Sequence, residues 1–339
     1  FVFIIFLILN LIIYENNLSY LKDYRIGIGI VIYVYVAKAI IVNDREKYLL
    51  GKIIIVNALV LSVFALLHHY FFDYIIVCVA SDVSGIPFII DKSISSVHVR
   101  GMRECSFVFQ PTVFATLVLM GMFINIFLSK NINKKIKWRS FILTILFMTA
   151  ILLSLSRIPI VFAILLTLIH LYKLINRKRI FWFLMPSIFI IIIMNNLNHP
   201  ILLRLSNFEL GGYRYEKYMV GLQTVFDNLI NILIGTDRLL MTALKTPTGI
   251  KFTDNSFIYL LLFFGIIYFF ILVFYMIINL WSRVDLRRNL YQLLIVLFIF
   301  SELMFTSFIA QDILLLYSFI TLILLERHPA DKVLTKINT

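Results

Sequence analysis

The chain has 339 residues, of which 61% are hydrophobic and only 14% are charged, and its formal net charge is +13. A water-soluble globule of this size cannot bury so much apolar side chain, so the composition excludes a soluble enzyme, a disordered chain and a nucleic-acid-binding module. The two cysteines are too few for a disulfide framework or a thiolate metal site.

Apolar stretches long enough to cross a bilayer, which takes about 20 residues, recur along the whole chain. They predict an all-α polytopic membrane protein with about ten transmembrane helices in one transmembrane domain, residues 1–339. The predicted spans are 1–14, 26–42, 53–68, 111–129, 140–156, 158–175, 180–197, 256–281, 290–309 and 313–325. Arg157 and Pro159 separate the fifth span from the sixth, because arginine is costly at mid-membrane and proline suits the first turn of a helix.

The positions of Lys and Arg predict the orientation of these spans. If successive connections alternate between the two sides, the short connections and the tail from residue 326 hold 18 Lys and Arg against 5 Asp and Glu. The remaining connections hold 12 against 12. Because cytoplasmic loops carry the excess of positive charge, the short connections are predicted to be cytoplasmic. Two long loops, 68–110 and 198–255, then face outward, and this topology accounts for the net charge without an acidic partner.

The second long loop is predicted to contain an amphipathic helix, about 213–233, that lies on or just above the membrane surface. Seven apolar residues recur there at spacings of three and four, and glycines stand before and after them. The seven are Tyr215, Tyr218, Met219, Leu222, Val225, Phe226 and Leu229, with Gly211 and Gly212 before them and Gly235 after them. In the first long loop, the apolar segment 71–90 contains Asp73, Gly85 and Pro87, so an interfacial or re-entrant piece is expected.

Motifs of several enzyme classes are missing from the sequence. It contains no Asp-x-Asp, no His-Glu-x-x-His, no Gly-x-x-x-x-Gly-Lys and no Cys-x-x-Cys. A metal-dependent nucleotide-sugar site, a zincin, a P-loop ATPase and a zinc site therefore lack sequence support, and we expect neither a metal nor a cofactor.

Outward arginines are the main candidates for binding residues, because the guanidinium offers a planar fork of donors that matches phosphate oxygens in pairs. Arg157 stands out because it lies between two spans with almost no loop around it, although an interfacial anchor that reaches lipid headgroups is the alternative. Arg214 lies near the start of the predicted amphipathic helix, where the helix N-terminus already favours an anion. Arg100 and Arg103, in the first long loop, are either further phosphate-binding residues or solvated loop charges.

Asp254 is the main candidate for a general base. It lies where the second long loop re-enters the membrane, so its carboxylate is partly desolvated and suited to accept a proton from a sugar hydroxyl. The alternative is that it caps the helix that follows, a position for which Asp is well suited. Glu104 and Asp237 are weaker candidates. Glu302, inside a predicted span, fits either a proton-coupled group or a satisfied buried carboxyl.

Four segments resemble, in the same order, motifs of the O-antigen polymerase and ligase superfamily, and together they cover about residues 100–265. They are the outer-loop arginine motif Arg103-Glu104-Cys105-Ser106-Phe107, the Ser-Arg junction Leu153-Ser154-Leu155-Ser156-Arg157, the run Gly212-Tyr213-Arg214-Tyr215-Glu216-Lys217-Tyr218 with Gly235-Thr236-Asp237 after it, and the re-entry motif Thr253-Asp254-Asn255-Ser256-Phe257.

This resemblance implies a GT-C-like glycosyltransferase of the bacterial inner membrane, with its active site facing the periplasm. In that family a polyprenyl-diphosphate-linked glycan is the donor, arginines hold the diphosphate, and a sugar hydroxyl attacks with inversion and without a metal. The expected function is Wzy-type polymerisation of a surface polysaccharide, O-antigen or capsule. The implied partners are undecaprenyl-diphosphate-linked oligosaccharides as donor and acceptor, the lipid bilayer and a protein that regulates chain length, with no nucleic acid.

The resemblance also suggests roles for individual residues. The residues implied for diphosphate binding are Arg157, Arg214, Arg103 and Arg100, the one implied for catalysis is Asp254, and the weaker candidates are Glu104, Asp237, Tyr218 and Asn255. Ligases of the superfamily typically carry a His just before the Asn of the re-entry motif, where this chain has Asp254. This departure favours a polymerase over an O-antigen ligase, which is the nearest alternative.

Two rival functions from other classes predict different sequence features. A lipid-linked oligosaccharide flippase should show internal repeats and a charged central cavity, and a proton-coupled transporter should show paired ionisable groups at mid-membrane. Charge inside the predicted spans is limited to Lys38 and Glu302, apart from the span ends. The sequence therefore disfavours both rivals.

The charge distribution makes a direct prediction about topology. Residues near 75–108 and 200–252 should be extracytoplasmic, and 130–139 and 282–289 should be cytoplasmic. Single cysteines introduced on a cysteine-free background in intact cells should react with an impermeant thiol reagent at position 245 and not at position 135. Labelling at 135 without labelling at 245 would reverse the orientation.

Overall fold

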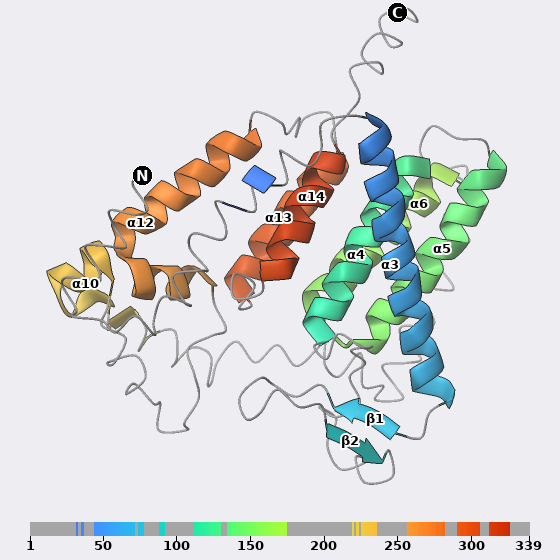
Figure 1. Ribbon diagram of the computed structural model, residues 1–339, viewed down its shortest axis with the longest axis horizontal. Helices are drawn as coiled ribbons and strands as arrows, with labels where there is room; N and C mark the ends of the chain where they lie inside the picture. Colours follow the sequence, from blue (N-terminus) through green and yellow to red (C-terminus); the bar gives the residue numbers. More distant parts are fainter. Residues whose placement is uncertain are drawn as a thin grey trace, which may run out of the picture. The chain divides into compact units, whose positions relative to one another are not determined.

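The computed structural model describes residues 32, 35–36, 44–71, 74–77, 88–91, 111–129, 134–174, 219, 222–223, 225–235, 256–281, 290–305 and 312–325. Apart from two short strands, the elements formed by these residues are helices (Figure 1). The chain divides into two compact units, one formed by Asn43–Phe208 and the other by Phe1–Val42 together with Glu209–Thr339. The predicted single transmembrane domain, with outer loops at 68–110 and 198–255, stays a prediction.

The Asn43–Phe208 unit contains a helical bundle with one helix at its centre. Its helices are α3 (Asp44–Phe71), α4 (Pro111–Leu128), α5 (Lys134–Leu153) and α6 (Arg157–Leu174). Helix α4 contacts α3, α5 and α6, and α3 also contacts α5. From Val113 to Ile126 every side chain of α4 except Leu117 is buried. A helix that is apolar all round can be enclosed on every side, and the contacts of α4 with three neighbouring helices place it at the centre.

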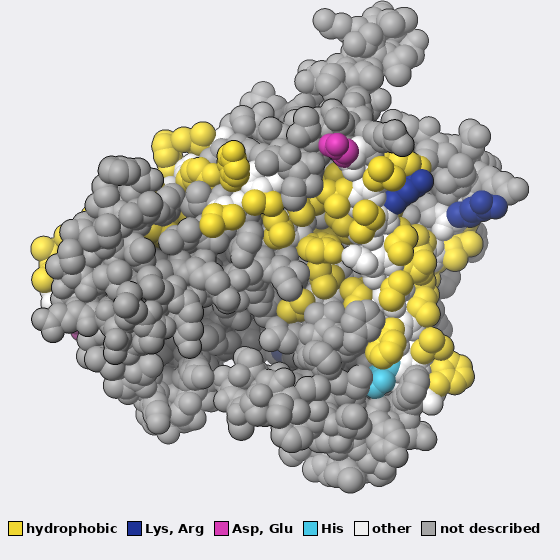
Figure 2. Space-filling model, in the orientation of Figure 1, with side chains coloured by type: hydrophobic (Ala, Val, Ile, Leu, Met, Phe, Trp, Pro, Cys, Tyr) yellow, Lys and Arg dark blue, Asp and Glu magenta, His cyan; other side chains and the backbone are white. Residues whose placement is uncertain are grey.

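Two of the described helices are long and apolar enough to cross a membrane, Glu46–Phe71 and Pro111–Leu128. Figure 2 shows hydrophobic side chains gathered along α3. The shorter apolar helices are Trp138–Leu153, Arg157–Tyr172, Gly265–Tyr275 and Leu290–Leu303. The predicted division of 140–156 from 158–175 is confirmed, because α5 ends at Leu153 and α6 begins at Arg157. The ten-span topology stays a prediction, and the spans 1–14 and 180–197 lie outside the described residues.

Helices α3 and α4 approach each other closely through small residues. Gly51, Ala58 and Ala65 recur every seven residues on the buried face of α3. A Cβ atom placed on Gly121 of α4 would overlap the Cβ of Ala58. Small residues let two helix backbones come together and gain contacts along their length, which is the usual way in which helices associate in an apolar solvent. The sequence alone showed no heptad pattern here, because the repeat consists of only three small residues.

The segment 71–90, predicted to be an interfacial or re-entrant piece, contributes to a two-stranded sheet, and its position at the membrane stays a prediction. Strands β1 (Tyr74–Val77) and β2 (Phe88–Asp91) form an antiparallel pair, with Tyr74 opposite Asp91 and Val77 opposite Phe88. Both strands consist largely of β-branched and aromatic residues, which favour paired strands. The apolar character that suggested membrane contact thus belongs, in these eight residues, to a two-stranded sheet.

The other unit contains four described helices that contact one another in succession. They are α10 (Leu229–Ile234), α12 (Ser256–Trp281), α13 (Leu290–Phe305) and α14 (Asp312–Leu324). Helix α10 packs on α12, α12 on α13, and α13 on α14. The ends of α13 and α14 agree with the predicted spans 290–309 and 313–325 to within four residues.

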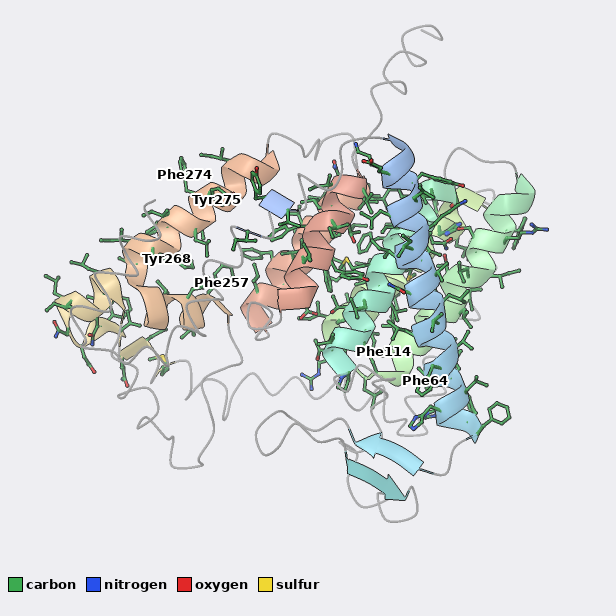
Figure 3. The ribbon with its side chains drawn as sticks, in the orientation of Figure 1. Phe64, Phe114, Phe257, Tyr268, Phe274 and Tyr275 are labelled. Carbon is green, nitrogen blue, oxygen red and sulfur yellow. The ribbon has the colours of Figure 1, made fainter. Side chains whose placement is uncertain are left out.

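The predicted span 256–281 has the same bounds as α12, but the helix is broken at Gly265. This residue has φ 72° and ψ 177°, a conformation that glycine adopts far more readily than other residues. The ring centroids of Phe257 and Phe269 are 5.8 Å apart, whereas twelve residues of continuous helix rise about 18 Å. The first part of α12 therefore folds back toward the second, and Phe257 also packs against Phe300 of α13 (Figure 3).

The predicted amphipathic helix 213–233 is also divided. Described residues up to Phe226 are helical, Asp227 is in a turn, and a new helix, α10, begins at Leu229. The Asn228 side chain accepts a hydrogen bond from the Ile230 N–H at 3.1 Å, so it caps α10 and competes with continuation of the earlier helix. The predicted stop at Gly235 is confirmed, since this residue is the C-cap of α10 with φ 101°.

The contact between Gly121 and Ala58 gives a prediction about stability. Gly121→Ala should lower the free energy of unfolding by about 1–3 kcal/mol, because the added methyl group forces two packed helices apart. The loss should be smaller when the same substitution is made in an Ala58→Gly background, where the overlapping methyl group is gone. Unfolding of the purified protein in detergent would measure both, and an equal loss in the two backgrounds would contradict the contact.

Candidate functional site

Of the nine residues predicted to bind substrate or take part in catalysis, the structure describes Arg157. The other eight lie outside the described residues, and their mutual arrangement stays a prediction; they are Asp254, Asn255, Arg214, Tyr218, Asp237, Arg100, Arg103 and Glu104. The two cysteines, Cys78 and Cys105, also lie outside the described residues. The geometry of the candidate site is therefore built from Arg157 and the turn that carries it.

Three residues connect α5 to α6, and they form a hydrogen-bonded turn. The Ser154 hydroxyl donates to the Ile151 carbonyl at 2.6 Å and accepts the Ser156 N–H at 3.1 Å. The backbone N–H groups of Ser154 and Leu155 donate to the carbonyls of Ile151 and Leu152, both at 3.1 Å. One serine side chain thus bridges the last turn of α5 and the residue before α6. Ser154 is completely buried and Ser156 is 4% exposed, so the turn is packed inside the bundle and not loose on its surface.

Leu155, at the centre of this turn, has a left-handed backbone conformation with φ 52°. Among the described residues it is the only one other than glycine with a positive φ. This conformation costs an ordinary L-residue roughly 1–2 kcal/mol, and it persists where the surrounding structure fixes it. The leucine side chain is buried, so a glycine here would relieve the backbone but leave an unfilled space. Such strain next to a candidate ligand-binding arginine is typical of functional sites.

Arg157 is the first residue of α6, and its side chain is half-buried. The Ser156 carbonyl accepts the Ile160 N–H at 3.1 Å, which starts the helical hydrogen-bond pattern. Pro159 has no N–H, so this residue leaves no unpaired backbone donor in the first turn of α6.

The electrostatics of this helix start favour an anion. The N-terminal end of a helix carries a partial positive charge that favours acidic residues, yet the first turn of α6 contains no acidic residue and begins with an arginine. Two sources of positive potential therefore add at one position. A phosphate placed there would meet a guanidinium and helix N–H groups together, which is the arrangement that phosphate oxygens bind.

A buried polar network, not predicted from the sequence, connects α4, α5 and α6. It lies toward the ends of α5 and α6 that are far from the turn between them. The side-chain amide of Asn125 in α4 donates to the Ser140 carbonyl at 2.9 Å and to the Thr144 hydroxyl at 3.1 Å, both in α5. The Thr144 hydroxyl is also 3.3 Å from Nδ1 of His170 in α6. All four residues are buried. The signal that could have found them is the presence of a polar residue at the same predicted depth in three neighbouring spans.

The Thr144 hydroxyl has one proton to share between two possible acceptors. It donates to the Ser140 carbonyl at 2.9 Å, within its own helix. The oxygen then accepts from Asn125, and its contact with His170 is completed when Nδ1 carries the imidazole proton. The ring of His170 meets the ring of Phe141 edge to face, with centroids 5.7 Å apart. The network therefore connects three helices through one hydroxyl group.

Glu302 is completely buried in α13. Gln292, Ile295 and Ile299 are also buried, and their spacing places them on the same face of the helix as Glu302. One buried face of α13 thus has Gln292 toward its first end and Glu302 toward its other end. The two interpretations of Glu302, a proton-coupled group or a satisfied buried carboxyl, both stay open.

Comparisons with known proteins identify no relative: no family model, no curated protein and no solved structure matches the chain. Among the described residues, no group of three or more His, Cys, Asp and Glu side chains could hold a metal ion. The features that bear on function are therefore the arginine at the start of α6 and the four motif-like segments of the sequence.

The network around Thr144 gives a second prediction about stability. Thr144→Val keeps the shape of the side chain but removes the hydroxyl that Asn125 and His170 share, leaving buried donors without this partner. The free energy of unfolding should fall by about 1–2 kcal/mol. Thr149→Val is the matched control, because Thr149 lies on the same helix, is exposed, and donates its hydroxyl to the Leu146 carbonyl of its own helix at 2.8 Å. Equal effects of the two substitutions in detergent unfolding would show that the network contributes nothing.

Proposed function

We propose that this chain is a multi-pass membrane glycosyltransferase that polymerises a surface polysaccharide from polyprenyl-diphosphate-linked repeat units. The observation that carries the proposal is the position of Arg157, which begins α6 on a buried, strained turn and adds its charge to the positive end of the helix. The resemblance of this junction and of three other segments to the O-antigen polymerase and ligase superfamily supports the same reaction.

The chemistry explains why an arginine at a helix start suits this reaction. When the glycosidic bond to the diphosphate breaks, the diphosphate leaves with the bonding electron pair and gains negative charge. Donors that are already oriented toward that charge stabilise the transition state without further reorganisation. The guanidinium of Arg157 offers paired donors, and the partial positive charge at the start of α6 adds to its charge. Arg214, Arg103 and Arg100 are proposed to contact the same diphosphate.

The acceptor half of the reaction requires a base. The hydroxyl oxygen of the acceptor sugar attacks the anomeric carbon from the side opposite the diphosphate, so the configuration is inverted. Its proton is proposed to pass to Asp254, which precedes α12 by two residues. Glu104 and Asp237 are the alternative bases, and Tyr218 and Asn255 are proposed to contact the sugars.

The cellular setting belongs to the same proposal. Ten transmembrane helices in a GT-C-like arrangement would place the two long loops on the periplasmic side of the bacterial inner membrane, where undecaprenyl-diphosphate-linked oligosaccharides are donor and acceptor. The apolar outer sides of α3, α5 and α6 support a membrane environment, since large hydrophobic side chains such as Val60, Ile142 and Val161 are exposed on them. A chain-length regulator is the proposed protein partner.

Substitution of Arg157 tests the proposal. Arg157→Ala should reduce polymer formation about 100- to 1000-fold, as expected when one donor to a developing anion is removed. Arg157→Lys should also be impaired, because a point charge lacks the paired donors. The measurement is polymer formation from a purified lipid-linked repeat unit in proteoliposomes, with the amount of inserted protein determined in parallel.

Arg139→Ala is the matched control, because Arg139 is an exposed arginine at the other end of α5. It should form polymer at the wild-type rate. Full-length polymer from Arg157→Ala would refute the role in diphosphate binding. The surface glycan of a deletion strain then separates the two members of the superfamily: single attached repeat units indicate a polymerase, and absence of attachment indicates a ligase.

A further inference from the structure

One face of α3 exposes a continuous row of apolar side chains. They recur at spacings of three and four residues and are Leu49, Ile53, Val56, Val60, Val63, Leu67 and Tyr70. We call this row the α3 stripe. The opposite face of the same helix is buried against α4 and α5, and the contrast is sharp between neighbours: Val60 is 52% exposed, whereas Leu61 is 6% exposed. The helix therefore has a protein-facing side and an apolar side that the described protein does not cover.

The length of the uncharged part of α3 matches the hydrocarbon core of a bilayer. From Ile53 to Phe71 the helix contains no Asp, Glu, Lys or Arg over 19 residues. At 1.5 Å per residue this part is about 28 Å long, and the hydrocarbon core is about 30 Å thick. The polar side chain exposed between Ile53 and Leu67 is Asn57, which lies at the edge of the stripe, near its first turn. Contact of this long apolar surface with water would be unfavourable, whereas acyl chains would cover it without that cost.

Both ends of the stripe have the features of a membrane–water boundary. At the first end, the Lys52 ammonium lies 4.3 Å from the centroid of the Tyr48 ring, one turn back toward the start of the helix. The lysine thus directs its charge away from the stripe, as lysines near the end of a membrane helix do. At the other end, His69 packs edge to face on Tyr70, with centroids 5.0 Å apart, and Tyr70 and Phe71 are exposed. Aromatic residues such as Tyr concentrate at membrane interfaces, because their rings are amphipathic.

The interior of the unit has the reverse polarity. The buried Ser62 hydroxyl bonds the Ala58 carbonyl of its own helix, and Asn125, Thr144 and His170 bond one another between helices. In the hydrocarbon core of a bilayer, a polar group that faces lipid finds no hydrogen-bond partner. A membrane protein therefore turns its polar groups inward and its apolar groups outward, as this unit does.

We infer that α3 lies at the boundary between protein and lipid, and that acyl chains of the bilayer cover the α3 stripe. This inference goes beyond the proposed reaction and does not depend on it, because an inactive protein would contact lipid in the same way. It also assigns different positions to the two described helices that are long and apolar enough to cross a membrane: α3 contacts lipid along one side, and α4 contacts protein all round.

Spin labels on the α3 stripe test this inference directly. Single cysteines at Ile53, Val56, Val60, Val63 and Leu67, in the full chain with Cys78 and Cys105 replaced by Ser, would carry nitroxides in reconstituted vesicles. These side chains are exposed, so the labels should not disturb packing. The ratio of oxygen to nickel-chelate accessibility should be highest at Val60 and Val63 and should fall toward both ends of the uncharged segment, because oxygen concentrates in the bilayer centre and the chelate stays in water. A label at Tyr48 is the aqueous control.

Each alternative occupant gives a different result. High nickel-chelate accessibility along the whole stripe would mean that water covers it and would overturn the inference. Low accessibility to both reagents would mean that protein covers it; spectral broadening that disappears on dilution with unlabelled protein would then identify a second copy. Quenching by brominated lipids of a Val60→Trp variant in which the three native tryptophans are replaced by Phe provides an independent measurement that needs no label. Absence of quenching would also overturn the inference. Failure of the Arg157 experiment would leave these results unchanged.

Discussion

Several polar groups in the Asn43–Phe208 unit find their partners inside the bundle, while large apolar side chains are exposed on the outer sides of its helices. Helix α4 makes this possible: it is enclosed by α3, α5 and α6, and it brings Asn125 to the hydroxyl of Thr144 and the carbonyl of Ser140. The close approach of Gly121 to Ala58 draws α3 against the same central helix. The bundle is thus held by contact between small residues on one side of α4 and by hydrogen bonds on another.

A need for internal hydrogen-bond partners also shapes the turn that carries Arg157. Because the turn is buried, its backbone groups cannot rely on water, and the Ser154 hydroxyl supplies both a donor and an acceptor. The turn is tight enough that Leu155 adopts a left-handed conformation, and α6 then begins at once with a cation at its positive end. The charge of the arginine and the helix dipole then add, and an anion is favoured at this position. That is the physical basis of the proposal that a diphosphate binds here.

In the other unit, the two differences from the predicted helices arise at residues with a strong local preference. Gly265 breaks α12 through a conformation that other residues rarely adopt, and Asn228 ends one helix and starts another by capping the Ile230 N–H. Both residues were visible in the sequence. A glycine inside an apolar span is nevertheless ambiguous, since Gly121 lies within a continuous helix where it serves close packing. The contact of Phe257 with Phe269 and Phe300 stabilises the broken form of α12, and that contact is not a local property.

The sequence by itself determined the helical, membrane-compatible character of the chain, the boundary between α5 and α6 and the stop at Gly235, because composition, charge and helix-ending residues act locally. It also singled out Arg157, from the absence of a loop around it. Only the tertiary structure decided that α4 is central, that Ser154 and Leu155 shape the turn before Arg157, that Asn125, Thr144 and His170 meet, and that β1 pairs with β2. These features depend on which residues distant in the chain come together. Hydrophobicity predicts that a helix enters an apolar environment, but only packing decides which of its sides meets protein.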